Sequence, residues 1–427
     1  MSTARYAYHY ATHGRTPVET GRVLIDHALL SQADGHLQQM AEVSRDRPAW
    51  AQDLVQIARA VFLADKLSPR GHSDDRWTRH LDLMVQVSEP DAWTEAALAL
   101  LSRLAKTLTA DRWTIRVRPG AAIWPHQGRV LASSQVEEVA LFSGGLDSAA
   151  YAADRARLRR GDLLLVSYFE PHWARQQTRV GDAIDVLRAR TIRQFRASQQ
   201  VVARRPDLEP SARSRGLLYM ATAVYLAAAH DVPQVAVPEN GQLALNPALT
   251  PARVAACSTR SVHPHTLALL NELIEAVGGS VVVVNPYLHL TKGEVCRRAV
   301  TAGLPASALT GATLSCGRPP RDRPELHCGH CYPCLVRHSG LLAALDGDDT
   351  PYGKDIWTVD DAADAAVDRR ALHRWLSRPF GMRDLVTDMP LPRDLDPAPL
   401  VDVVERGRAE LVDMFRRHGE TVIRRTR

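Results

Sequence analysis

The chain has 427 residues, of which 45% are apolar and 24% are charged, a composition typical of a globular protein with two or three domains. A formal net charge of +5 allows weak attraction to phosphorylated ligands, but it does not make nucleic acid a required partner. No apolar run reaches the roughly 18 residues of a spanning helix, and the N-terminus lacks the pattern of a secretory signal. We therefore expect a cytoplasmic protein without a membrane role.

The first part of the chain, residues 1–134, is expected to form an α+β extension. Its patterns predict, in order, a helix at 51–66, a strand at 80–87, a helix at 93–108 and a strand at 112–117. The following segment, 118–128, is rich in turn-forming residues and marks a boundary.

The central part, residues 135–310, alternates between strand and helix patterns. Short apolar or β-branched runs, typical of strands covered on both faces, occur at 136–142, 163–169, 192–197, 234–237 and 281–284. Helical patterns follow at 149–159, 176–189, 215–230, 264–277 and 292–301. This alternation predicts an α/β fold with a doubly wound parallel sheet, whose ligand binds at the carboxyl ends of the strands.

A glycine-rich loop joins the first of these strands to the first of these helices. Its residues are Ser143, Gly144, Gly145, Leu146, Asp147 and Ser148. Adjacent glycines let backbone amides turn towards an anion, and the helix N-terminus adds unpaired N–H groups. The serine hydroxyls suit phosphate oxygens, and Asp147 suits Mg²⁺. The loop lacks the lysine of a Walker A motif, and it is similar to the loop of the PP-loop family, in which ATP is split between its α and β phosphates.

Four cysteines lie close together in the segment 311–345. They are Cys316, Cys328, Cys331 and Cys334. Thiolates at this spacing can enclose one tetrahedral Zn²⁺ without an open position, which predicts a structural zinc site. His327, His330 and His338 flank the cluster, and replacement of one cysteine ligand by a histidine is an alternative. The remaining cysteines are Cys257, in a loop, and Cys296, on the apolar face of a helix.

The last part of the chain, residues 346–427, is expected to be a helical region. Its helical patterns are broken by proline-rich linkers such as 389–397. The sequence contains no internal repeat and no low-complexity tract.

The loop and the cysteine cluster together resemble the 7-cyano-7-deazaguanine synthase (QueC) family, over about residues 136–342. Three further stretches match the order of the family's motifs, at 214–219, 285–294 and 312–316. The resemblance implies an enzyme that uses ATP, Mg²⁺ and Zn²⁺ and adenylates the carboxylate of 7-carboxy-7-deazaguanine. A cation should stabilise the charge that builds on the α-phosphate, and Lys292 and Arg215 are the candidates for this catalytic role beside Asp147.

The chain departs from the family in the region where the deazapurine is recognised. Asn240, Arg260 and His263 suit a base edge or a carboxylate, and Trp173 suits stacking on the base. Typical members also lack counterparts of the two extensions. The longer pattern resembles the QueC-like component (QatC) of the Qat anti-phage defence system, which implies partner proteins that bind through these extensions.

Several interpretations stay open from the sequence. The activated carboxylate could pass to ammonia, giving an amide and then a nitrile, or to an amine of a partner protein, giving a conjugate. A tRNA-modifying PP-loop enzyme is a second hypothesis, and it requires a reactive cysteine, Cys257 or Cys296. A noncatalytic nucleotide-binding scaffold of a defence complex is the third.

Overall fold

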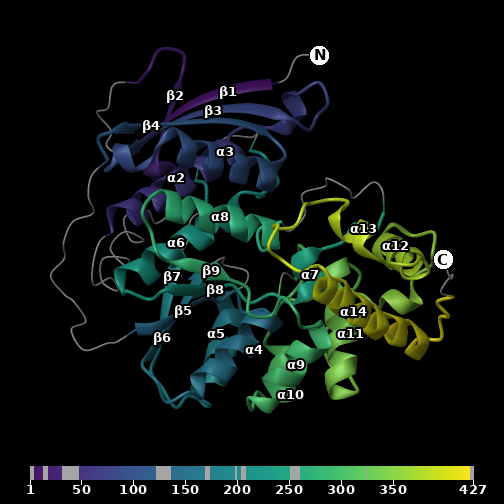
Figure 1. The fold of residues 1–427 in the computed structure, drawn as a ribbon. Coiled ribbons are helices and arrows are strands. Elements are labelled where there is room, and N and C mark those ends of the chain that lie inside the picture. The colour runs from purple at the N-terminus through teal and green to yellow at the C-terminus, as the bar shows by residue number, and fades with distance from the viewer. Residues whose placement is uncertain are drawn as a thin grey trace.

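The computed structural model describes residues 4–12, 18–30, 48–121, 136–168, 174–197, 200–202, 208–250, 260–323 and 325–423. These residues form a mixed α/β structure with two sheets, both built from parallel strands. Helices lie between the two sheets and beyond the second one (Figure 1). Within the described ranges, no helix is both long enough and apolar enough to cross a membrane.

The N-terminal part is a four-stranded parallel sheet covered on one face by two helices. Its strands lie in the order β2 (Val23–Asp26), β1 (Ala4–Ala11), β3 (Arg79–Val87) and β4 (Arg112–Pro119). The covering helices are α2 (Ala49–Lys66) and α3 (Glu95–Thr109). The expected α+β extension is therefore a parallel α/β layer, because each helix crosses over between parallel strands. The sequence patterns did not predict β1, although its Tyr8 and Tyr10 alternate towards the core.

The central part is a five-stranded parallel sheet. Its strand order is β7 (Ile192–Ala197), β6 (Asp162–Tyr168), β5 (Val136–Leu141), β8 (Gln234–Ala236) and β9 (Val282–Val284). All five predicted strands are confirmed, and their ends differ from the prediction by at most one residue. The strand order reverses between β5 and β8, and such a reversal opens a crevice at the carboxyl edge of a parallel sheet.

Helices pack on both faces of the central sheet. One face is covered by α6 (Arg215–Ala229) and α8 (Pro264–Ala276), and the other by α4 (Leu146–Ala156), α5 (Ala174–Asp185) and α9 (Lys292–Thr301). Val139 points to the first face and Ala140 to the second, as the alternation along a strand requires. Burial on both faces explains why the strands are nearly continuous apolar runs.

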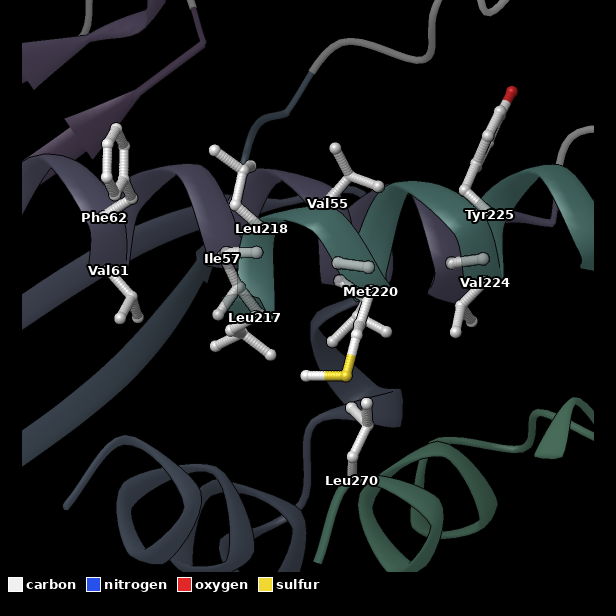
Figure 2. Packing of buried hydrophobic residues seen from close by; sticks show 14 of the residues in the cluster. Val55, Ile57, Val61, Phe62, Leu217, Leu218, Met220, Val224, Tyr225 and Leu270 are labelled. Carbon is white, nitrogen blue, oxygen red and sulfur yellow. The ribbon is translucent and has the colours of Figure 1, made fainter. Parts of the chain in front are cut away.

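The two sheets share one hydrophobic core. Helix α2 packs against α6, and α3 packs against α8. Figure 2 shows side chains from this region, among them Ile57 of α2, Leu217 and Met220 of α6, and Leu270 of α8. Each fully buried side chain of this size contributes about 1.5–3 kcal/mol. The N-terminal layer is thus attached to the central sheet through a continuous apolar interior.

A buried network of charges joins the same layers. Arg79 of β3 lies 2.6 Å from the carboxylates of both Asp65 and Asp111. Asp65 also accepts a hydrogen bond from the hydroxyl of Ser214, directly before α6, at 2.7 Å. Because buried charges are tolerated only when they are paired, these contacts fix the start of α6 against the N-terminal layer.

The helical C-terminal region forms a further core. It comprises α12 (Val367–Leu376), α13 (Met382–Val386) and α14 (Ala398–Arg417), which join α11 (Tyr332–Leu345) and α7 (Gly241–Leu245). The short helix α10 (Ala306–Gly311) precedes the cysteine cluster. Helix α14 contacts α11, α7 and α9, and Figure 1 shows these helices grouped beside the central sheet. The region predicted to be helical therefore lies close to the loops that follow β8 and β9.

Candidate active site

The glycine-rich loop follows β5 at the centre of the sheet, as the sequence predicts. Gly145 is the N-cap of α4, so the positive end of this helix faces the loop. The backbone amides of Gly144 and Gly145 lie 3.2 Å from the hydroxyls of Ser148 and Ser143, respectively. These polar groups lie together at the N-terminus of the helix, a place that favours a phosphate.

The surroundings of both glycines of the loop favour a residue without a side chain. Gly144 has φ 81°, in the left-handed region that favours glycine, and a Cβ there would lie 3.0 Å from Cγ of Gln177. A Cβ on Gly145 would lie 3.2 Å from the carbonyl oxygen of Leu314. The loop therefore has close contacts with α5 on one side and, on the other, with residues 311–345, the cysteine segment.

Asp147 forms a buried ion pair with Lys292. The ammonium nitrogen lies 2.5 Å from Oδ2, and both side chains are less than one-tenth exposed. Asp147 is in the first turn of α4, and Lys292 is the first residue of α9. They meet because α4 and α9 pack side by side on the same face of the sheet. The structure thus brings together two of the three residues expected to be catalytic.

Glu239 and Asn240, which follow β8, complete this cluster. The amide nitrogen of Asn240 donates to Oδ2 of Asp147 at 3.2 Å and to Oε1 of Glu239 at 2.9 Å. The ammonium of Lys292 lies 3.9 Å from Oε1 of Glu239. The side-chain oxygen of Asn240 also caps α7 by accepting from the amide of Leu243. Two carboxyl groups are thereby held next to each other by one ammonium and one amide.

The charges of the cluster follow from burial and from these neighbours. Burial would raise the pKa of Asp147, but the Lys292 ammonium overcomes this effect and the pKa is lowered. Burial would lower the pKa of Lys292, but the carboxyl groups of Asp147 and Glu239 raise it. Burial and the charge of Asp147 together hold the pKa of Glu239 well above its usual value. Asp147 and Lys292 are therefore charged at neutral pH, whereas Glu239 takes up a proton readily.

The carboxyl groups fit a divalent cation. Oδ1 of Asp147 is buried and has no hydrogen-bond partner among the described residues. A carboxylate oxygen left without a partner beside a second carboxyl group is a donor set that hard cations prefer. Asp147 and Glu239 are thus the residues that would hold Mg²⁺, which when bound would neutralise part of the charge of a polyphosphate.

The four clustered cysteines converge as a metal site requires. Their sulfur atoms all lie within 4.8 Å of one another, and all four residues are buried. The Cys328–Cys334 and Cys331–Cys334 sulfur separations are 3.8 and 3.4 Å. Tetrahedral zinc with Zn–S bonds of about 2.3 Å places its sulfurs about 3.8 Å apart. The cluster could therefore hold Zn²⁺ with four cysteine ligands.

The three flanking histidines have other partners. Nε2 of His327 accepts from the amide of Ser315 at 3.1 Å. A ring nitrogen of His330 lies 3.1 Å from the carbonyl of Cys328, and one of His338 lies 2.7 Å from a carboxylate oxygen of Asp348. These contacts favour the four-cysteine set over a mixed set of ligands.

The cysteine segment contacts the glycine-rich loop at 143–148, which we call the phosphate loop. The amide of Leu314 donates to the carbonyl of Gly144 at 3.2 Å, and the amide of Leu146 donates to the hydroxyl of Ser315 at 3.4 Å. Ser315 directly precedes Cys316. A metal held by the cysteines would therefore also fix one wall of the phosphate loop.

A cavity of about 540 Å³ joins these features. Its lining includes Asp147 and Lys292, Ser315 and Arg318 of the cysteine segment, and Asp368 of α12. This volume lies in the range typical of small-molecule sites. The loop, the cation and the C-terminal region thus face one common space.

The structure does not bring the other predicted site residues to this cavity. The guanidinium of Arg215 lies over the ring of Tyr219, 5.7 Å from its centroid. Arg260 pairs with Asp388 at 2.8 Å, and His263 caps the start of α8 by accepting from the amide of His265. None of these three lines the cavity within the described part of the chain. Trp173 and Cys257 lie outside the described residues.

Four residues of the site, Glu239, Ser315, Arg318 and Asp368, were not predicted from the sequence. Glu239 had a usable signal, because it follows a predicted strand at the edge where ligands bind in such sheets. Ser315 directly precedes the predicted metal ligand Cys316. Its role depends on the hydrogen bond that its hydroxyl accepts from the distant amide of Leu146, which no local pattern indicates. Asp368 lies more than 200 residues from the loop and carries no local signal.

Comparison with known proteins points to the same region. Residues 261–345, which include Lys292 and the four cysteines, match the family model described as "Queuosine biosynthesis protein QueC". The chain is similar to the 7-cyano-7-deazaguanine synthases of Syntrophobacter fumaroxidans (40% identical over 73 residues), Novosphingobium aromaticivorans (37% over 87) and Geotalea uraniireducens (36% over 76). This part of the chain is therefore QueC-like.

The similarity covers only part of each protein. It spans 17%, 20% and 18% of this chain, and 29%, 35% and 31% of the three relatives in the same order. The chain thus spans about a third of the length of the curated relatives that it matches. The phosphate loop, at 143–148, precedes the residues matched by the family model, so its interpretation depends on its own residues and geometry.

Loss of one cysteine should remove the metal and loosen the phosphate loop. In Cys331→Ser we expect zinc content to fall from about one per chain to less than about 0.2, and MgATP affinity to fall about tenfold, because the segment carrying Ser315 loses its anchor. Metal analysis and calorimetric titration measure the two effects. Cys296→Ala, at a buried cysteine outside the cluster, is the matched control. Zinc retained by Cys331→Ser would contradict this assignment.

The environment of His263 predicts a specific pH dependence of stability. Burial, with help from His265 and Arg260, lowers the pKa of His263 to about 3. The unfolded chain therefore binds this proton more tightly, so stability should fall between about pH 6.5 and 3, by up to about 1.4 kcal/mol per pH unit. His263→Asn, which keeps a capping side chain, should flatten this slope in urea denaturation measured from pH 7 to 4. His289→Asn, at an exposed histidine, should retain it, and equal slopes in both variants would refute the assignment.

Proposed function

We propose that this protein is an ATP-dependent enzyme of the PP-loop type that adenylates the carboxylate of a 7-carboxy-7-deazaguanine-type substrate. The observation that carries the proposal is the buried pair of Asp147 and Lys292 beside the phosphate loop, in a cavity that also reaches the cysteine segment. Further support comes from the QueC-like match over residues 261–345. The central sheet order and its helices on both faces are compatible with a doubly wound fold of the PP-loop type.

In the proposed reaction, the chemistry takes place at the α-phosphate. The substrate carboxylate oxygen attacks the α-phosphorus, the bond from this phosphorus to the bridging oxygen breaks, and pyrophosphate leaves. Negative charge grows on the phosphate oxygens during this step, and a preorganised cation in a buried site stabilises it strongly. Lys292 is suited to this role because Asp147 keeps it protonated. The loop amides and the serine hydroxyls would hold the departing phosphates.

The acyl adenylate then passes to an amine. The amine nitrogen forms a bond to the acyl carbon, the bond from this carbon to the AMP oxygen breaks, and nitrogen loses a proton. Ammonia gives an amide, and a partner-protein amine gives a conjugate. We favour the conjugate because the chain carries extensions beyond the QueC-like segment. Arg318 also lines the cavity and is a candidate contact for the substrate or the acceptor.

We further propose that the enzyme acts with partner proteins in anti-phage defence of the Qat type. The division into 1–134, 135–310, 311–345 and 346–427 is part of this proposal, with the first and last parts as partner-binding extensions. Support comes from the sequence regions outside the QueC-like match. Cytoplasmic location belongs to the same proposal.

The tRNA-modifying alternative gains little support from Cys296. Its thiol is 1% exposed, and burial raises its pKa to about 12. Such a group is neither accessible nor ionised at neutral pH, whereas sulfur carriers require an accessible thiolate.

The direct test is product analysis with MgATP and 7-carboxy-7-deazaguanine. We expect AMP and pyrophosphate in equal amounts, detected by chromatography. Lys292→Met should lower kcat/KM by about 10²–10³, because it removes one charge that acts on the transition state. Lys106→Met, at an exposed lysine of α3, is the matched control and should keep full activity. Release of ADP and phosphate would contradict the proposal.

A further inference from the structure

The C-terminal helix α14 reaches the start of α9, the helix that carries Lys292. Oε1 of Glu410 accepts a hydrogen bond from the hydroxyl of Thr291 at 2.5 Å. Oε2 of the same carboxyl group accepts from the backbone amide of Gly293 at 3.1 Å. Glu410 thus contacts the residues immediately before and after Lys292.

These bonds complete the cap of α9. Thr291 and Glu294 form a capping box, in which each side chain accepts from the backbone amide of the other. This capping box provides no acceptor for the backbone amide of Gly293. The amide donates instead to Glu410 of α14, which lies 117 residues further along the chain. A carboxyl group at a helix N-terminus is also favoured by the helix dipole. The first turn of α9 is therefore held from within and from α14.

Close packing leaves little freedom for Lys292 itself. A Cβ on Gly340 of α11 would collide with Cγ of Lys292, and a Cβ on Gly293 would collide with Oε1 of Glu410. Arg406, one turn before Glu410 on α14, pairs with Glu294 of the capping box. Both glycines thus allow α11 and α14 to approach the turn that carries the cation.

We propose that Glu410 is a positioning residue, which sets the place of the Lys292 ammonium by capping α9 from the C-terminal region. This inference builds on the proposed function, since it assigns the C-terminal extension a part in the adenylation step. A displacement of about 1 Å at a reacting centre can cost 10²-fold in rate, so a capping residue outside the cavity can control turnover.

The test compares Glu410→Ala, Glu410→Gln and Asp413→Ala in the full chain. In Glu410→Ala we expect kcat for AMP release to fall about 10- to 100-fold, with KM for MgATP changed less than about threefold. Glu410→Gln should recover kcat to within about threefold of wild type, because its amide oxygen still accepts from Gly293. Asp413, which pairs with Arg416 and Arg417 on the same helix, provides the matched control, and its variant should behave as wild type.

Hydrogen–deuterium exchange of a peptide spanning 289–296 gives a readout that does not need activity. The amides at the start of α9 should exchange faster in Glu410→Ala and at the wild-type rate in Glu410→Gln. An unchanged kcat in folded Glu410→Ala, or an equal loss in both Glu410 variants, would overturn the positioning role. If the wild type releases no AMP, the proposed function fails, and hydrogen–deuterium exchange alone tests the capping of α9 by Glu410. Unaltered exchange in Glu410→Ala would then show that Glu410 does not stabilise the start of α9.

Discussion

The buried ion pair between Asp147 and Lys292 is the interaction on which the rest of the site depends. Each partner alone would be an uncompensated charge inside the protein, at a cost of several kcal/mol. The pair is nevertheless placed there, and Asn240 and Glu239 supply further polar contacts. The pair lies where α4 and α9 meet. The fold therefore has to fix the first turns of these two helices, which are far apart in the sequence, next to each other.

Three separate parts of the structure hold these helix starts. The central sheet places the loop before α4, and the cysteine segment contacts this loop through Leu314 and Ser315. The C-terminal helix α14 contacts the first turn of α9. A metal in the cysteine cluster would act on the same geometry, because metal binding free energy is also folding free energy. The extensions are thus packed into the fold rather than appended to it, and the N-terminal layer shares its apolar core.

Local features of the site were predictable from the sequence, and contacts between distant segments were not. The phosphate loop and the cysteine cluster are contiguous patterns whose chemistry follows from their spacing. Lys292 was identified as a candidate catalytic cation from the resemblance to the QueC family. The contacts of Asn240 with Asp147 and of Glu410 with Gly293 join residues more than 90 residues apart, and no local pattern encodes them. Arg260 was a candidate for binding a carboxylate, and in the structure its guanidinium pairs with the carboxylate of Asp388.

The same contrast holds for the fold. Strands of the central sheet are apolar runs with clear ends, so their prediction was accurate to one residue. The N-terminal layer was predicted with two of its four strands, because β2 is only four residues long and β1 alternates tyrosine with polar and small residues. Parallel pairing, which depends on crossover helices, is a tertiary property that strand patterns alone do not define.

In the proposed reaction, this site forms an acyl adenylate by reversible cleavage of ATP between its α and β phosphates. Isotope exchange between pyrophosphate and ATP tests it most directly, because it requires the adenylate and no acceptor amine. With MgATP, radiolabelled pyrophosphate and 7-carboxy-7-deazaguanine, we expect label to enter ATP only when the carboxylate is present. Turnover of ATP without any transfer of label from pyrophosphate would contradict it.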